Sequence, residues 1–299
     1  MIDSRWVPKS PGCSLYIRPT LIGTRPCEYF LPAPAQPVDS CDHLAALGVA
    51  PSDEAMLYVI LSPTGPYFRT GSKAVRLLAV GKHVRSWPGG TAGYKLGINY
   101  PACFFPQQEA AKKGYQQVLW LLGDGNDDFM SMKVTEAGSM NFFVAVKRQD
   151  GDGMRARNPS SAAVTSFAFL GLDVITPPLD GTILPGVTRE SCITLLRSHS
   201  SVSPLDSLDP DFAVHVHETP VTIGDIYKWS SEGRLLEAFG VGTAAVVSGV
   251  GAIGLDGHPD VEMPQHDGGL GPVGRALYNR ITDIQEGKVE FGDWSHLCM

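Results

Sequence analysis

The sequence predicts a mixed α/β protein, and three observations lead to that expectation. Short runs rich in aromatic and β-branched residues recur along the chain, as they do in strands. Between these runs lie segments with helical spacing of apolar residues or with a proline suited to a first helical turn. Apolar residues make up 43% and charged residues 18% of the 299 residues, which is typical of a folded protein with one or two domains.

The N-terminal part of the chain contains two predicted strands and a predicted insertion. Residues 14–22, SLYIRPTLI, and residues 56–62, MLYVILS, have the composition of strands. Residues 26–53 contain PAPAQP and many small side chains, which indicates a loop insertion. A proline- and glycine-containing break, PTGP at 63–66, follows the second strand and is the candidate domain boundary. The expected division is a small domain at 1–63, an interdomain loop at 64–75 and a large domain at 76–299.

The remainder of the chain contains further strands and four helices. Strands are expected at 74–80, 117–122 and 140–146, and helices at 106–113, 187–197 and 222–232. A C-terminal amphipathic helix is expected because apolar residues recur at helical spacing at Leu270, Val273, Leu277, Ile281 and Ile284. Residues 148–166 are polar, and we expect them to be mobile.

The long uncharged run from Ala238 to Leu255 meets the length criterion for a membrane span. Five glycines interrupt it, so two buried strands joined by glycine turns explain it better. A net charge of −7 without a cluster of Lys or Arg argues against nucleic acid as the main partner. The first ten residues have no apolar core and are not a secretory signal. The six cysteines are scattered, which predicts reduced thiols in an intracellular protein: Cys13, Cys27, Cys41, Cys103, Cys192 and Cys298.

Three short motifs resemble binding sites, but each lacks a feature that its type of site requires. GVGAIG at 249–254 has dinucleotide-binding spacing, but LDGHP follows it where a helix is required. Asp124, Asn126 and Asp128 imitate a calcium loop that lacks glycine at its sixth position and glutamate at its twelfth. His215 and His217 alternate on one strand face without an evident third metal ligand, so we expect them to be surface residues.

The stretch GGTAGYKLGINY at 89–100 is the candidate centre of the chemistry. Lys95 is its only charged residue and has no local ion-pair partner. In apolar surroundings a lysine loses proton affinity, and its neutral amine can attack a carbonyl group to form a Schiff base. The alternative is an exposed lysine in a glycine-rich turn.

Two other segments complete this candidate site. Glu136 lies among small and apolar neighbours just before the strand predicted at 140–146, although it could also be a strand-edge glutamate facing water. LPGVTR at 184–189 leads into a predicted helix, where free backbone amides attract a phosphate. The alternative there is an ordinary helix start.

Five motifs together resemble one known family. In chain order they are VRSWPGGTAGYKLGINY, QQVLWLLG, TEAGSMNFF, TPPLDGTILPGVTRES and FGVGTAAVV. They resemble the branched-chain amino-acid aminotransferases, which are fold-type IV, class IV enzymes that depend on pyridoxal 5'-phosphate. The resemblance extends from about Trp6 to Trp294 and implies the large domain of that fold with a remnant of its smaller N-terminal domain.

The resemblance also implies roles for individual residues. Lys95 matches the amine that binds the cofactor aldehyde, Tyr100 the donor to its phenolic oxygen, and Glu136 the partner of its pyridine nitrogen. The positions that match phosphate contacts are Val187, Thr188 and Thr243. The positions that match the substrate pocket are Tyr67, Ser139, Ala244 and Ala245.

The implied reaction is transfer of the amino group of leucine, isoleucine or valine to 2-oxoglutarate. A homodimer is implied, with amino acids and 2-oxo acids as ligands and neither nucleic acid nor membrane as a partner. The compartment stays open between cytoplasm and mitochondrial matrix. One alternative is a truncated paralogue that acts as a non-catalytic partner subunit. Another is a different fold-type IV enzyme, a D-amino-acid transaminase or an aminodeoxychorismate lyase.

The chain also departs from the family pattern. It begins inside the small domain, so the arginine of that domain that contacts the cofactor phosphate has no counterpart here. Ile98 replaces a usual glycine, and Ala245 and Ser248 occupy the positions of a redox cysteine pair found in some animal members.

Overall fold

The computed structural model divides the chain into two compact units, Met1–Tyr67 and Phe68–Met299. The residues that the structure describes are 4–10, 12–24, 51–65, 74–123, 125, 128–149, 171–199, 205–206, 208–209 and 213–296. Most of the two predicted insertions, 26–53 and 148–166, therefore lies outside the described residues. So does part of the segment around the expected domain boundary, and the division at 63 and 75 stays a prediction.

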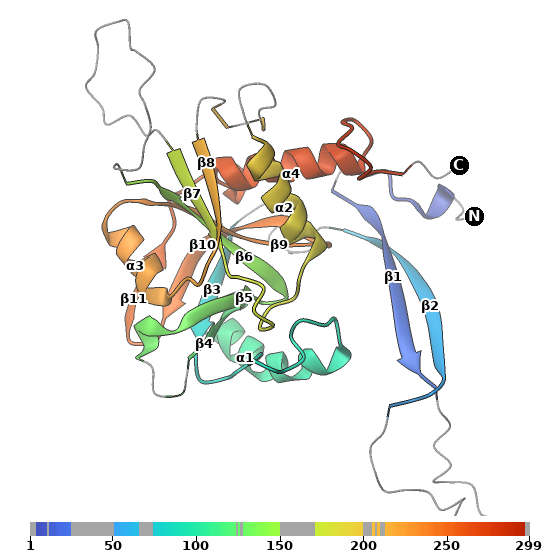
Figure 1. Ribbon diagram of the computed structural model, residues 1–299, viewed down its shortest axis with the longest axis horizontal. Coiled ribbons are helices and arrows are strands. Elements are labelled where there is room, and N and C mark those ends of the chain that lie inside the picture. Colours follow the sequence, from blue (N-terminus) through green and yellow to red (C-terminus); the bar gives the residue numbers. More distant parts are fainter. Residues whose placement is uncertain are drawn as a thin grey trace, which may run out of the picture. The chain divides into compact units, whose positions relative to one another are not determined.

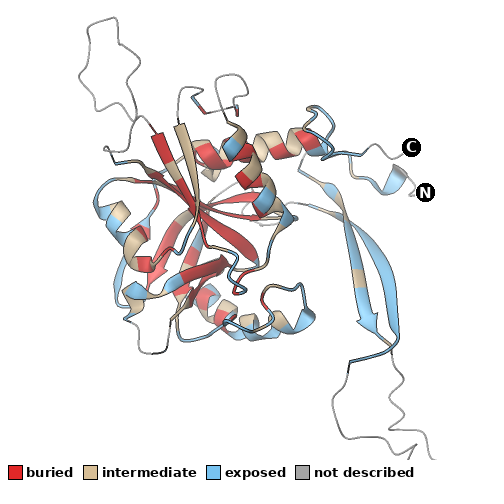
Figure 2. Cartoon of the chain, viewed as in Figure 1, coloured by how far each residue is buried: buried red, intermediate tan, exposed pale blue. Residues whose placement is uncertain are grey.

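The N-terminal unit contains the two predicted strands as an antiparallel pair. β1 (Ser14–Gly23) and β2 (Ala55–Thr64) run side by side, with Ser14 opposite Thr64 and Gly23 opposite Ala55. A short 3-10 helix, η1 (Ser4–Trp6), precedes them. Figure 2 shows both strands largely exposed, and Leu21 and Leu57 are 69% and 67% exposed. None of the described residues of this unit is buried, so the pair has no core of its own.

The C-terminal unit is built on a nine-stranded sheet of mixed direction. Its strand order is β11-β10-β3-β4-β5-β6-β7-β8, and β9 pairs with both β10 and β6. The strands are β3 (Val75–Val80), β4 (Gln117–Leu122), β5 (Lys133–Ala137), β6 (Met140–Lys147), β7 (Gly171–Thr176), β8 (Ala213–Glu218), β9 (Leu235–Gly242), β10 (Val246–Leu255) and β11 (His258–Glu262). Because β9 pairs on both edges, six strands close into a ring.

The ring encloses the main hydrophobic core. Each of its six strands contributes a buried side chain to one cluster: Leu77, Leu119, Val134, Phe142, Ala238 and Val250. Outside the ring, α2 (Val187–Ser198) and α4 (Pro272–Gln285) contact each other and β9, as Figure 1 shows. α1 (Pro101–Lys112) packs on β3 and β4, and α3 (Ile223–Ser231) lies against β9, β11 and the 3-10 helix η5 (Phe129–Ser131). The predicted mixed α/β class is confirmed.

Local sequence explains the helices that were predicted. Thr222 caps α3 by accepting from the amide of Asp225, and the Asp225 carboxylate accepts from the amide of Thr222. α4 buries the apolar stripe that contains Val273, Leu277 and Ile281. The predicted start of α1 at Pro106 was wrong, because Pro101 already occupies the first turn and Pro106 lies inside the helix.

The predicted reading of residues 238–255 as two buried strands is confirmed. They form most of β9 and β10, and Thr243, Ala244 and Ala245 make the turn between them instead of glycines. Val246 follows with a φ of 56°. The glycines at 249–254 lie inside β10, which continues into β11, so the rejection of a dinucleotide-binding motif is confirmed. Among the described residues, no helix combines the length and apolar composition that crossing a membrane requires.

Candidate functional site

Lys95 lies in the loop that connects β3 to α1, and one asparagine fixes this loop. The Asn99 side-chain amide donates to the carbonyl oxygens of Thr91 and Tyr94, at 3.0 and 2.8 Å. Beyond this turn, Tyr100 is the N-cap residue of α1. The Lys95 Nζ lies 3.4 Å from the Tyr100 hydroxyl, so the loop brings an amine and a phenol together.

The surroundings of Lys95 differ from the expectation. The sequence predicts a lysine in apolar surroundings, whereas its side chain is exposed in this chain. The apolar neighbours Leu96 and Ile98 are themselves exposed, at 43% and 74%, because the loop runs over the surface. Desolvation by the chain's own loop was therefore a wrong prediction, and any apolar cover for Lys95 has to come from a bound molecule or another part of the protein.

Glu136 lies in β5 and is buried, which excludes the alternative of a strand-edge glutamate facing water. Its Oε2 accepts from the guanidinium of Arg85, a buried residue of the same loop as Lys95. Burial raises the pKa of the Glu136 carboxyl, while Arg85, the amide of Leu184 and the charge of Lys95 each lower it. The Lys95 ammonium is thus close enough to Glu136 to act on it electrostatically.

The start of α2 lies beside Glu136. The Glu136 Oε1 accepts from the amide of Leu184 at 3.2 Å, and Gly186 is the N-cap residue of α2 two positions later. No side chain among the described residues caps this helix start. Val187 is 82% exposed and Thr188 is half-buried, so the first amides of α2 are available to an anion.

Four of the remaining predicted residues lie in two turns at the same edge of the ring. Val241 pairs with Asn141, which in turn pairs with Glu136, so the turn at 243–245 follows directly after this row. Thr243 and Ala244 are exposed there, and Ala245 is half-buried. Ser139 is exposed in the turn between β5 and β6. Tyr67 lies outside the described residues.

Two residues near this site were not predicted. Arg85 lies in the loop after β3, between Val84 and Ser86, and its sequence neighbours give no signal of its partner. Asn141 is only 4% exposed, and its side chain donates to both Glu136 and the carbonyl of Leu184. A lone amide in the apolar run MNFFVAV was the available signal, since buried polar side chains need partners.

The described residues thus bring four kinds of group to one edge of the ring: an exposed amine, a phenol, a buried carboxylate with a fixed ion-pair partner, and an uncapped helix start. These groups fit a molecule that carries an aldehyde, a basic ring nitrogen and a phosphate. Ile98, at the position of a usual glycine, does not have a positive φ, so the loop forms without that glycine.

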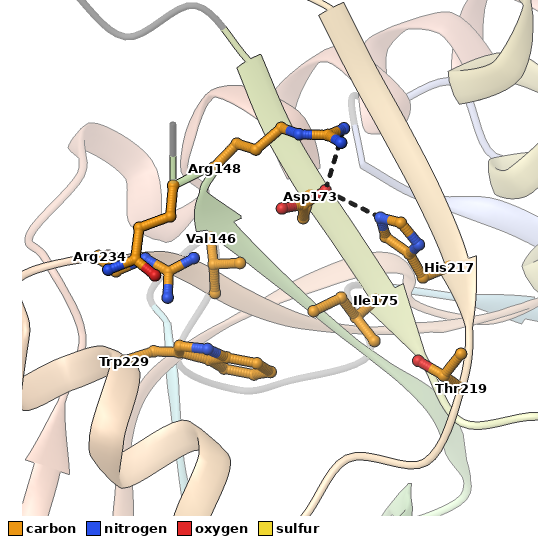
Figure 3. A pocket seen from close by; sticks show the side chains of 9 residues that line it. Val146, Arg148, Asp173, Ile175, His217, Thr219, Trp229 and Arg234 are labelled. Atoms are coloured by element: carbon orange, nitrogen blue, oxygen red, sulfur yellow. Dashed lines mark hydrogen bonds and ion pairs between the residues drawn. The ribbon is translucent and has the colours of Figure 1, made fainter. Parts of the chain in front are cut away.

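A hollow lies at the end of β6 away from Glu136 (Figure 3). Its volume is about 350 Å³, and charged residues that line it take part in ion pairs. Asp173 contacts His217 at 2.8 Å and Arg148 at 3.7 Å, while Arg234 contacts Glu232 at 3.3 Å. The histidines expected on the surface are only partly exposed, and burial lowers the pKa of His215. Among the described residues, no three or more His, Cys, Asp or Glu side chains cluster in a way that could hold a metal ion.

Comparison with known proteins identifies the family of this chain. Residues 43–253 match the family described as amino-transferase class IV. The mitochondrial branched-chain-amino-acid aminotransferase of Schizosaccharomyces pombe is 42% identical over 98% of this chain and 56% of its own length. The cytosolic enzyme of Saccharomyces cerevisiae is 40% identical over 99% of this chain and 65% of its own length. The chain therefore spans about three fifths of the length of these relatives.

A solved structure shows the same fold. The branched-chain amino acid aminotransferase of Thermobaculum terrenum, in its PLP form, aligns with a TM-score of 0.52 and 20% identity over 90% of this chain and 64% of its own. The family match covers more than two thirds of the chain, and the amine, buried carboxylate and helix start all fall within it. The chain belongs to the class IV aminotransferase family.

Proposed function

We propose that this chain is a pyridoxal 5'-phosphate-dependent transaminase that transfers the amino group of leucine, isoleucine or valine to 2-oxoglutarate. The observation that carries the proposal is the placement of a carboxylate and an amine at one site. A buried carboxylate, Glu136, lies within electrostatic reach of an exposed amine, Lys95, whose Nζ contacts the Tyr100 hydroxyl. The names of the similar proteins supply the substrate class.

The cofactor, when bound, would supply an aldehyde and an electron-withdrawing pyridine ring. Lys95 would provide the amine that binds the aldehyde, and the same Nζ would later carry a proton to and from the substrate carbon. Tyr100 would donate from its hydroxyl to the phenolic oxygen of the ring. Glu136 would hold a proton on the ring nitrogen, because Arg85 stabilises its anionic form.

The proposed phosphate and substrate contacts surround this centre. The start of α2 and the turn after β9 present amides and hydroxyls to an anion through Val187, Thr188 and Thr243. We assign the substrate to the residues Tyr67, Ser139, Ala244 and Ala245. We also propose that the active form is a homodimer, since apolar side chains of β1 and β2 are exposed in a single chain. The names of the relatives include both mitochondrial and cytosolic forms, so the compartment stays open between the two.

Borohydride reduction of the protein after mixing with pyridoxal 5'-phosphate tests the cofactor role. Peptide mapping should find the reduced adduct on Lys95, and the adduct should be absent from Lys95→Ala. Lys82→Ala is the matched control, because Lys82 is an exposed lysine of the same loop. An adduct that persists in Lys95→Ala and disappears in Lys82→Ala would reject the assignment.

A panel of amino donors tests the reaction. Leucine with 2-oxoglutarate should yield glutamate, and an enzymatic glutamate assay measures the amount formed. Turnover with D-alanine but not leucine would identify a different fold-type IV transaminase. A Lys95 adduct without turnover of any donor would identify a cofactor-binding chain that is not an active transaminase.

A further inference from the structure

Among the described residues near the candidate site, Asn141 has the most deeply buried amide side chain, and it takes no direct part in the proposed reaction. It is the second residue of β6, directly opposite Glu136 in the β5–β6 pair. Its exposed fraction is 4%. A buried amide has to find hydrogen-bond partners, so its contacts identify what it supports.

The Asn141 amide bridges two elements. Its Nδ2 donates to the Glu136 Oε1 at 3.2 Å and to the carbonyl oxygen of Leu184 at 2.8 Å. The amide of Leu184 donates to the same Oε1 at 3.2 Å. The three groups therefore form a closed network in which the carboxylate oxygen and the segment before α2 share one side chain.

The start of α2 is fitted to the same side chain. A Cβ atom at Gly186 would overlap the Asn141 Oδ1, so this backbone can approach Asn141 only as glycine. Gly186 is the N-cap residue of α2. Asn141 therefore contacts the carboxylate through its nitrogen and lies against the helix start through its oxygen.

The other carboxylate oxygen of Glu136 has a separate partner, because Arg85 binds Oε2. Removal of the Asn141 amide would leave that ion pair in place but would free Oε1 and the Leu184 carbonyl from their shared donor. The carboxylate could then rotate about the Arg85 contact, and residues 184–186 could shift with it.

We propose that Asn141 is a positioning residue that sets the Glu136 carboxylate and the anion-binding start of α2 in one fixed relation. This inference rests on the proposed function, in which the carboxylate faces the ring nitrogen and the helix start receives the phosphate of one cofactor. A single side chain thus sets the spacing between the group that contacts the ring nitrogen and the group that contacts the phosphate.

Hydrogen exchange of the protein without cofactor gives the first test. In Asn141→Ala the amide of Leu184 should exchange at least about 10-fold faster, because its acceptor is no longer fixed. Thr176→Val is the matched control: Thr176 is fully buried and donates to the carbonyl of Phe142 at 2.8 Å, next to Asn141 in β6. This control should leave the exchange of Leu184 unchanged. Equal exchange at Leu184 in Asn141→Ala and the wild type would overturn the proposal.

Cofactor affinity gives the second test. Asn141→Ala should weaken binding of pyridoxal 5'-phosphate about 10-fold, and Asn141→Asp should weaken it further because a second carboxylate would face Glu136. In a Glu136→Gln background, the loss caused by Asn141→Ala should shrink, since interacting residues are not additive. Losses that are identical in both backgrounds would reject action through Glu136.

The two proposals fail in different ways. If the wild type forms no reducible adduct on Lys95, the proposed function is rejected. The predicted effect of Asn141 on cofactor affinity is then rejected as well. If the wild type binds the cofactor and Asn141→Ala binds it equally well with the same absorption spectrum, only the role of Asn141 is rejected. Circular dichroism melting of each variant identifies a loss that is due to unfolding, and Asn141→Ser then replaces an unfolded Asn141→Ala.

Discussion

Arg85 and Glu136 form an ion pair inside the protein, with side chains that are 5% and 2% exposed. Arg85 comes from the loop after β3 and Glu136 from β5, so the pair joins two parts of the chain that are 51 residues apart. Two charges removed from water are costly unless each has a partner, and removal of one partner leaves the other uncompensated. The pair therefore fixes the position of the carboxylate, and it makes the stability of the protein depend on Arg85.

Arg85→Met should destabilise the protein by about 3–5 kcal/mol, because Glu136 would remain buried without its cation. The same change should raise the pKa of Glu136 further, since the charge of Arg85 lowers it in the wild type. Urea unfolding measures the stability. Arg76→Met is the control: Arg76 pairs with Asp260 at 2.8 Å but is 44% exposed, so its loss should cost about 1 kcal/mol or less. Equal costs for the two variants would contradict a buried pair.

Tyr100→Phe should reduce turnover about 10-fold or more while leaving the fold intact. It removes only the hydroxyl that lies 3.4 Å from the Lys95 Nζ. The absorption spectrum of the bound cofactor and kcat are the measurements, with thermal melting as the check on folding. Tyr94→Phe is the matched control, because Tyr94 lies in the same loop and is 68% exposed. A Tyr100→Phe enzyme with wild-type kcat and spectrum would remove Tyr100 from the site.

The free energy of unfolding should fall as pH rises from about 5 to 8, because Glu237 loses its proton in this range. Glu237→Gln should remove the contribution of Glu237 to this fall. Burial raises the pKa of Glu237 to about 7, although the amides of Val273 and Gly274 at the start of α4 lower it. Since the folded pKa lies above the unfolded one, the native state binds more protons in this range. The associated free energy is fully present below the unfolded pKa, is lost as pH rises through the folded pKa, and is on the order of 3 kcal/mol.

Urea unfolding at a series of pH values checks this dependence. The difference in unfolding free energy between Glu237→Gln and the wild type should change with pH across that window and level off above it. Glu190→Gln, at an exposed position on α2, should follow the wild type throughout. A constant difference for Glu237→Gln would show that Glu237 does not titrate in the window.

Val246→Gly should change stability by less than about 1 kcal/mol, because two effects oppose each other. Val246 has a φ of 56°, a left-handed conformation that costs a β-branched residue roughly 1–2 kcal/mol and that glycine adopts freely. Loss of the half-buried side chain offsets this gain. Val247→Gly in the same strand removes a side chain that is 4% exposed and should cost about 2 kcal/mol or more. Similar costs for both variants would argue against strain at Val246.

The elements that sequence predicted well are those with a strong local signal. The apolar stripe of α4 and the glycine followed by a helical pattern at α2 depend only on neighbouring residues. β1, β2, β3, β4 and β6 contain dense branched and aromatic residues. β5 and β11 gave no such signal, because each has five residues and carries charged side chains. The start of α1 was misplaced because two prolines compete for it and only one can occupy the first turn.

For the candidate site, sequence alone predicted Lys95, Tyr100, Glu136 and the start of α2 as the chemical groups, because motif resemblance preserves residue type and order, and their roles stay predictions. It could not identify Arg85 and Asn141 as the partners of Glu136. The Asn141 amide reaches a carbonyl 43 residues away, and no local pattern encodes such a contact. Tertiary structure decided these partners because β9 pairs with both β6 and β10 and closes the ring, which brings distant segments to one edge and buries the charges that must then pair.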